Sequence, residues 1–229
     1  MTDATPVDDV IVIGKRKKKT NTNNPQFPQM VEVEEETGDT GGGGGELTPA
    51  DQAENERQKE CAAKKFKEKL QSDHPFQKKG KEFFSSIFER DGDTVVHPPV
   101  MGTGTLPGQG PNTAISGPDI AGANATYGVA PGSLLGFVHN HPSDVYCGSA
   151  DSYTQNLQRL TNQYPSEPDW AAADVMVSNG DPNTFVLYIV GCDNELRAFP
   201  YRDREEFKAE RAKTNPKTHP PVQPQGCEG

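Results

Sequence analysis

The spacing of apolar and polar residues divides the chain into a polar N-terminal part, a patterned middle and a polar end. Apolar residues are sparse before residue 47, which predicts a disordered linker over residues 1–46. From there the pattern follows helical or strand spacing in turn, and the last segment is charged and rich in proline. We expect a helical arm or first helix over 47–71, one compact domain over 72–203 and a polar tail over 204–229.

Three segments carry helix signals. Thr48-Pro49 indicates a helix start, since a hydroxyl cap is followed by proline, and the helix is expected to reach Leu70. A second helix, capped by Ser149 or Asp151, is predicted through Tyr164 because apolar residues recur there at spacings of three and four. A third, short helix is expected over 204–213.

Six runs have the composition of strands. Asp91-Gly92 is a two-residue hairpin signal between two of them. The segment 97–133 is rich in glycine and proline and is predicted to be a loop, and 165–170 is predicted to be a turn. The predicted strands are 80–89, 94–96, 133–139, 173–178, 184–190 and 195–199. The pattern therefore predicts an α+β fold, a mixed β-sheet flanked by helices.

Composition narrows the classes of function. The net charge of −10 disfavours nucleic acid as a partner, because such binding depends on neutralising phosphates. The sequence has neither a run of about 18 apolar residues nor a signal-peptide core, which predicts a soluble protein without a membrane partner, cytoplasmic or secreted by a non-Sec route. The four cysteines are scattered without a Cys-x-x-Cys pair, so we expect reduced, unpaired thiols; His219 in the tail is expected to be a free surface histidine.

The candidate chemistry centres on His139 and His141. Two imidazoles separated by one residue on an extended chain point to the same side, so they can bind one ion. Asp151 is a candidate third ligand, and three protein ligands with a fourth position for water are typical of catalytic zinc sites. The alternative is a pair of surface loop histidines. Cys147 lies inside the same candidate ligand loop.

The segment His139-Asn140-His141-Pro142, preceded by the apolar run 134–138 and followed by Ser149-Ala150-Asp151, resembles the signature of the JAMM/MPN+ (JAB domain) zinc metallopeptidases. In that family a strand ends in His-x-His-Pro, a Ser-x-x-Asp begins the next helix, and a glutamate lies on an earlier strand. Asp151 is one residue closer to the second histidine than the family's gap. The serine precedes it by two positions rather than three, so Gly148 occupies the family's serine position by register.

The resemblance implies a JAB/MPN-like domain that binds Zn²⁺ through His139, His141 and Asp151. It implies hydrolysis of a peptide or isopeptide bond in a polypeptide substrate, either a ubiquitin-like or a bacterial protein. Glu82 would be the general base, with Glu89 as the competing candidate, and Ser149 would stabilise the oxyanion.

A second resemblance concerns the N-terminal part. The apolar run that ends at Gly14, followed by low-complexity sequence, resembles the joint before the C-terminal effector modules of bacterial polymorphic toxins. This resemblance implies a toxin effector, with an immunity or carrier protein as a further partner.

Two other classes of function stay open. The first is a catalytically inactive MPN-like binding or scaffold domain, which the shortened ligand loop favours. The second is a different metallohydrolase, such as a nuclease, which the letters His-Asn-His suggest and the acidic charge disfavours. A zinc deaminase is disfavoured as well, because the sequence has no Pro-Cys-x-x-Cys.

Overall fold

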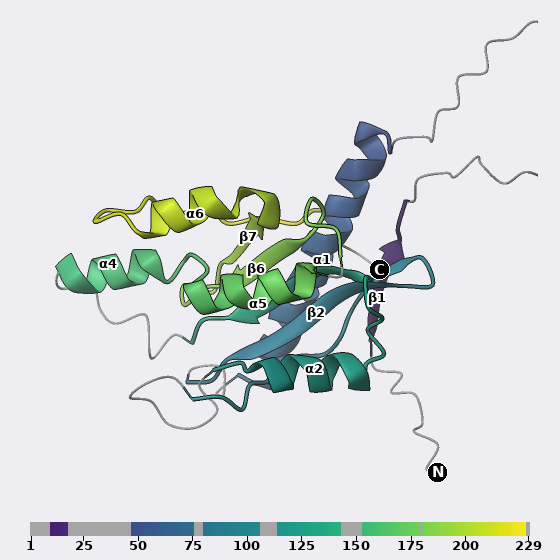
Figure 1. The fold of residues 1–229 in the computed structure, drawn as a ribbon, viewed down its shortest axis with the longest axis horizontal. Coiled ribbons are helices and arrows are strands. Elements are labelled where there is room, and N and C mark those ends of the chain that lie inside the picture. The colour runs from purple at the N-terminus through teal and green to yellow at the C-terminus, as the bar shows by residue number, and fades with distance from the viewer. Residues whose placement is uncertain are drawn as a thin grey trace, which may run out of the picture.

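The computed structural model describes residues 10–17, 47–75, 80–105, 114–142, 153–178 and 180–227. These residues form an α+β fold in which a mixed, open seven-stranded sheet is flanked by helices (Figure 1). The fold class predicted from the sequence is therefore confirmed. No helix in the described ranges is long and apolar enough to cross a membrane.

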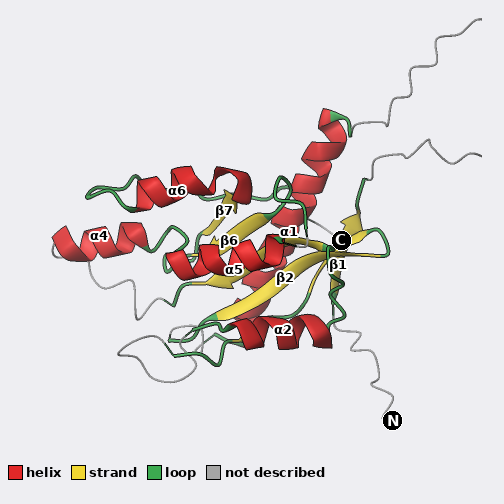
Figure 2. Ribbon diagram, in the orientation of Figure 1, coloured by secondary structure: helices red, strands yellow, loops and turns green. Residues whose placement is uncertain are grey.

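The sheet has the strand order β1-β3-β2-β5-β6-β7, and the short β4 pairs with β2 (Figure 2). Only the β5–β6 pair is parallel among the described strands; the other pairs are antiparallel. The strands are β1 (Ile11–Lys15), β2 (Phe83–Arg90), β3 (Asp93–Val96), β4 (Val100–Met101), β5 (Leu134–Asn140), β6 (Val186–Val190) and β7 (Leu196–Pro200). Strand β5 thus lies in the middle of the sheet, between β2 and β6.

Helices cover both faces of this sheet. In Figure 1, α2 and α5 lie in front of the strands, and α1 passes behind them. Helix α6 packs beside β7, and a 3-10 turn over Tyr201–Asp203 precedes it. The helices are α1 (Pro49–Asp73), α2 (Gly117–Thr126), α4 (Tyr153–Thr161), α5 (Glu167–Val177) and α6 (Arg204–Arg211).

Each face of the sheet contributes to its own hydrophobic cluster. Successive side chains of a strand point to opposite faces. On β2, Phe83 and Ile87 pack with Phe66 of α1, whereas Phe84 packs with Trp170 of α5 in the second cluster. All five side chains are almost completely buried. The central strands are therefore held between two apolar layers, a rigid position for any side chain at their ends.

Several predicted elements are confirmed. Helix α1 begins after Thr48, whose hydroxyl accepts a hydrogen bond from Asp51 N, with Pro49 at the first position. The β2–β3 hairpin turns at Asp91 and Gly92, which have φ values of 53° and 83°. The strand that leads into the histidine pair is also confirmed as β5, which contains His139.

Two segments contradict the prediction. The expected strand at 173–178 and turn at 165–170 are wrong, because residues 167–177 form the single helix α5, which Ser166 caps. The expected loop at 97–133 contains β4 and α2, and α2 begins with an equivalent cap at Ser116. In both helices the cap serine and an aspartate three residues later exchange hydrogen bonds, which is a capping box. The capping box begins a helix in each segment, although the composition nearby is typical of a strand or a loop.

The linker predicted over residues 1–46 is wrong for β1. Ile11 and Val12 pair with Val96 and Val95 of β3, and both Ile11 and Ile13 pack against the cluster beneath α1. Gln58 of α1 also donates a side-chain hydrogen bond to the Lys15 carbonyl, at 2.7 Å. The apolar run that ends at Gly14 is visible in the sequence, but its pairing with β3 is a tertiary contact that the polar composition of residues 1–46 does not reveal.

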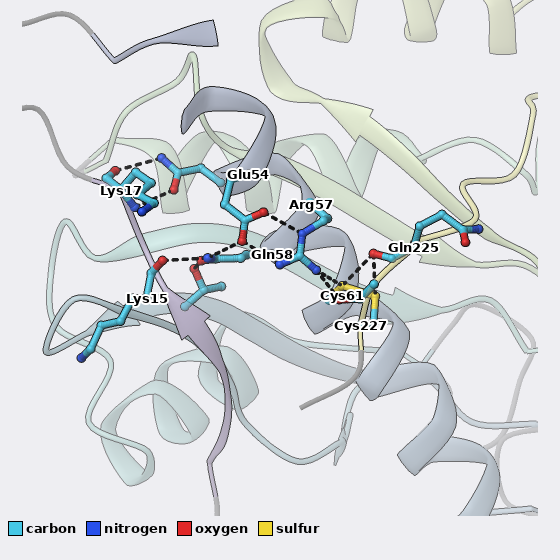
Figure 3. Close-up of polar contacts among 11 residues, drawn as sticks. Lys15, Lys17, Glu54, Arg57, Gln58, Cys61, Gln225 and Cys227 are labelled. Atoms are coloured by element: carbon cyan, nitrogen blue, oxygen red, sulfur yellow. Dashed lines mark hydrogen bonds and ion pairs between the residues drawn. A yellow bond between two sulfur atoms is a disulfide. The ribbon is translucent and has the colours of Figure 1, made fainter. Parts of the chain in front are cut away.

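The polar end of the chain is also attached to the domain. We call residues 216–227 the C-terminal strap. The strap runs beside β7, where Val222 N donates a hydrogen bond to the Leu196 carbonyl at 2.8 Å. A disulfide joins Cys227 to Cys61 of α1, and Arg57 donates to the Gly226 carbonyl nearby (Figure 3). The prediction of unpaired thiols is therefore wrong for this pair, and it is wrong for Cys192, which is also disulfide-bonded.

His219 of the strap is not a free surface residue, contrary to the prediction. Its ring stacks on Phe199 at a centroid distance of 4.5 Å, and its Nε2 lies 3.1 Å from the Ala198 carbonyl oxygen. The His219 carbonyl accepts a hydrogen bond from the buried Arg197. These contacts are tertiary, so a local view of the proline-rich tail does not show them.

Candidate metal site

Strand β5 places both histidines at the centre of the domain. His139 lies in the strand opposite Phe84 of β2 and Ile189 of β6. His141 follows the strand, and its N–H donates to the Val190 carbonyl at 3.0 Å. The two Nε2 atoms are 3.2 Å apart, and both residues are buried. The expectation that the two imidazoles share one side of an extended chain is confirmed.

Asp169 supplies the third side chain of this group. Its Oδ1 lies 3.4 Å from Nε2 of His139, and its Oδ2 lies 3.7 Å from Nε2 of His141. Asp169 is the third residue of α5, and its carboxylate accepts hydrogen bonds from the backbone N–H and the hydroxyl of Ser166. The capping box that starts α5 thus also fixes the carboxylate against the histidines.

The group fits a zinc ion by distance and by donor type. Tetrahedral zinc with bonds of about 2.0–2.1 Å to nitrogen or oxygen separates its ligand atoms by about 3.3 Å. The separations of 3.2, 3.4 and 3.7 Å among His139, His141 and Asp169 are close to that value. Two imidazoles and a carboxylate are a donor set that zinc accepts. This buried group can therefore hold a metal ion.

Hydrogen bonds and nearby charges determine the protonation states of the three candidate ligands. Nδ1 of His141 lies 2.6 Å from the Asn162 carbonyl oxygen, so this nitrogen carries a proton. Burial lowers the pKa of His141, but the hydrogen bond and charge of Asp169 outweigh burial and raise this pKa above its ordinary value, so a metal ion would displace a proton from Nε2 wherever the ring is protonated. Burial lowers the pKa of His139 to about 4, which keeps its ring neutral at neutral pH. Burial alone would raise the pKa of Asp169, but the two imidazoles and Ser166 lower it below its ordinary value, so the carboxylate is ionised.

Glu82 lies beside this group, just before β2. Its carboxylate accepts a hydrogen bond from Ile115 N at 3.1 Å and lines the same cavity as His141 and Asp169. Burial raises the pKa of Glu82 to about 7, with a further upward effect of Asp169 and an opposing effect of His141. A carboxyl group with a pKa near neutrality can both accept and return a proton under physiological conditions.

The other glutamate considered from the sequence lies elsewhere. Glu89 is at the far end of β2, where its carboxylate is 3.6 Å from the guanidinium of Arg16. It is absent from the lining of the cavity that contains Glu82. The structure therefore brings Glu82, and not Glu89, together with the histidines.

Ser149, Asp151 and Cys147 lie outside the described residues, so the roles predicted for Ser149 and Asp151 stay predictions. Sequence reasoning missed Asp169, although Ser166-Glu167-Pro168-Asp169 has the Ser-x-x-Asp spacing that Ser149 and Asp151 lack. A capping hydroxyl, a proline in the first turn and an acidic third residue are local signals of a helix start at Asp169, but they do not show its contact with the histidines.

No protein-family model matches the chain, and the curated proteins and solved structures contain no significant match to it. The assignment of a function therefore depends on the site itself.

Proposed function

We propose that this protein is a zinc-dependent hydrolase of peptide or isopeptide bonds. In this proposal His139, His141 and Asp169 bind the ion, and Glu82 is the general base. The observation that carries the proposal is the convergence of two buried imidazoles and an ionised carboxylate within 3.7 Å of one another. A second carboxyl group near its protonation midpoint faces the same cavity.

The residues of the chain have separate tasks in this reaction. A bound zinc ion would supply a Lewis acid that polarises the substrate carbonyl and acidifies a water molecule. Glu82 accepts the proton of the attacking water and later gives it to the leaving amine. Ser166 holds Asp169 in place through its hydroxyl and backbone N–H, which makes it a positioning residue in the proposal.

The disulfide supports a location for this activity. Structural disulfides persist in oxidising compartments and are rare in the cytosol. The Cys61–Cys227 bond therefore favours the secreted alternative over the cytoplasmic one. A polypeptide outside the producing cell's cytosol is then the substrate class that the proposal implies.

Metal analysis of purified variants tests the ligand set. We expect about one zinc per wild-type chain and a loss of zinc in His139→Ala, His141→Ala and Asp169→Asn. Asp151→Asn is the matched control, because the same change is made at the ligand that the sequence resemblance implies. Circular dichroism of each variant checks that the fold is kept. Retention of zinc by Asp169→Asn together with its loss from Asp151→Asn would overturn the assignment.

A further inference from the structure

An apolar cavity extends from the candidate metal site. It has a volume of about 820 Å³, and Glu82, His141 and Asp169 belong to its lining. Helix α2 forms one wall, helix α5 forms the other, and Phe137 of β5 lies between them. Ligand pockets commonly measure about 300–1,000 Å³, so this cavity is large enough for a substrate group.

The walls carry small or apolar side chains. Helix α2 contributes Ile120 and Ala121, and α5 contributes Ala172, Val175 and Met176. Val175 is 72% exposed although it is a large apolar residue. Contiguous exposed apolar surface marks ligand-binding grooves, and Val175 belongs to such a surface through the lining of the cavity. The cavity is therefore suited to an apolar group.

Arg211 of α6 adds a polar group to the same lining. Its Nε is buried and makes no hydrogen bond to any residue within the described ranges. This nitrogen is closed off from solvent and so does not face the open cavity, and the guanidinium therefore counts as a charged group of the lining. The cavity thus combines apolar walls with several polar residues, among them Ser116, Asn162 and Arg211, which fits a peptide better than a purely apolar ligand.

We infer that this cavity binds a bulky apolar side chain of the polypeptide substrate, next to the bond that is cleaved. The inference rests on the proposed function, since it places the substrate relative to the zinc ligands. Glu82 and His141 belong to the lining of the cavity. A side chain bound in the cavity would therefore lie close to the reacting carbonyl. The charged residues of the lining are Glu82 and Asp169 at the candidate metal site and Arg211 of α6. The rest of the α2 and α5 walls carries no charge, which disfavours an acidic or basic side chain there.

Binding of peptide hydroxamates tests the inference, because the hydroxamate group chelates zinc while the neighbouring side chain probes the cavity. The series differs only in that side chain: glycine, alanine, leucine and phenylalanine. Calorimetry with the zinc-loaded protein measures each Kd. We expect the leucine and phenylalanine compounds to bind at least about tenfold more tightly than the glycine compound, as is usual for filling an apolar pocket.

Ala121→Phe is the variant that fills the cavity. Ala121 is exposed on α2, so the change leaves the core intact. We expect this variant to lose the preference for large side chains and to bind the glycine compound with the wild-type Kd. Ala125→Phe is the matched control, because Ala125 is exposed on the same helix and is absent from the cavity lining. Val175→Lys should weaken binding of the leucine compound, because it places a charge on the exposed edge of the apolar cavity.

Each outcome decides a separate point. Equal Kd values across the series, or the same loss in Ala121→Phe and Ala125→Phe, would overturn the apolar side-chain site while leaving the zinc site intact. Absence of zinc in the wild-type protein, with no hydroxamate bound, would overturn the proposed function and this inference with it. Tight binding of an apolar compound without a hydroxamate group would assign the cavity to a different ligand.

Discussion

Breaking the Cys61–Cys227 disulfide should destabilise the protein by several kcal/mol. The bond joins a buried residue of α1 to the end of the C-terminal strap. The strap also donates the hydrogen bond from Val222 N to β7 and stacks His219 on Phe199. Cys227→Ser removes the covalent link and leaves these weaker contacts in place.

The magnitude follows from the length of chain that the bond closes. Cys61 and Cys227 are 166 positions apart, so the disulfide strongly restricts the unfolded chain. The chain-entropy relation gives about 5 kcal/mol for a loop of this length, and native disulfides commonly contribute about 2–5 kcal/mol. Because whole domains are stable by only about 5–15 kcal/mol, the loss would be a large share of the free energy of unfolding.

Urea unfolding of the wild type, Cys227→Ser, Cys61→Ala and the double variant measures this contribution. The double variant should lose little more than Cys227→Ser, because a single bond is removed in both. The urea dependence of the unfolding free energy should also become steeper in the variants, since the unfolded chain without the cross-link exposes more surface. A loss below about 1 kcal/mol in Cys227→Ser, with an unchanged slope, would refute the reasoning from chain entropy.

Three further predictions concern the site and the sheet. Glu82→Gln should keep the bound zinc and lower the cleavage rate of a denatured polypeptide mixture by about 10²–10⁴-fold; an unchanged rate would exclude Glu82 as the base. Burial lowers the pKa of His97 to about 4. His97 is therefore protonated below pH ~6.5 in the unfolded chain, but only below about pH 4 in the folded protein. The stability that the neutral ring contributes is thus complete above pH ~6.5 and is lost as the pH falls. Between about pH 8 and pH 5, the free energy of unfolding measured in urea should fall by about 2 kcal/mol more in the wild type than in His97→Gln. Gly136→Ala should cost about 1–3 kcal/mol in thermal unfolding, because a Cβ there would lie 2.7 Å from the Val186 carbonyl oxygen; an unchanged midpoint would mean that β5 and β6 move apart freely.

The elements predicted correctly are those whose signals are local. The Asp91-Gly92 turn and the Thr48-Pro49 cap each determine a backbone conformation within a few residues, and the structure confirms both elements. His139 and His141 followed from the two-residue period of an extended strand, which requires no knowledge of its neighbours. The α+β class followed because helical and strand periodicities are both present along the chain.

The third side chain of the metal group depends on tertiary structure. Asp169 meets His139 only because α5 packs against β5, and the sequence between them does not determine that packing. The family resemblance implies Asp151 instead, because its motif has a short spacing between the second histidine and the aspartate. The valine-rich composition of 173–178 also favoured a strand, whereas the capping box of Ser166 and Asp169 begins a helix there. Local propensity was outweighed by a cap and by burial of Trp170.

The placement of β1 at one edge of the sheet allows the protein to be divided into two fragments. The strand is held by its backbone pairing with β3, and side chains of α1 bind the Lys15 and Lys17 carbonyls (Figure 3). None of these interactions needs the covalent connection between residues 17 and 47. A protease cut in that connection would leave the strand in place, and a chain that starts at residue 47 would accept a synthetic peptide of residues 10–17 as a complementing fragment.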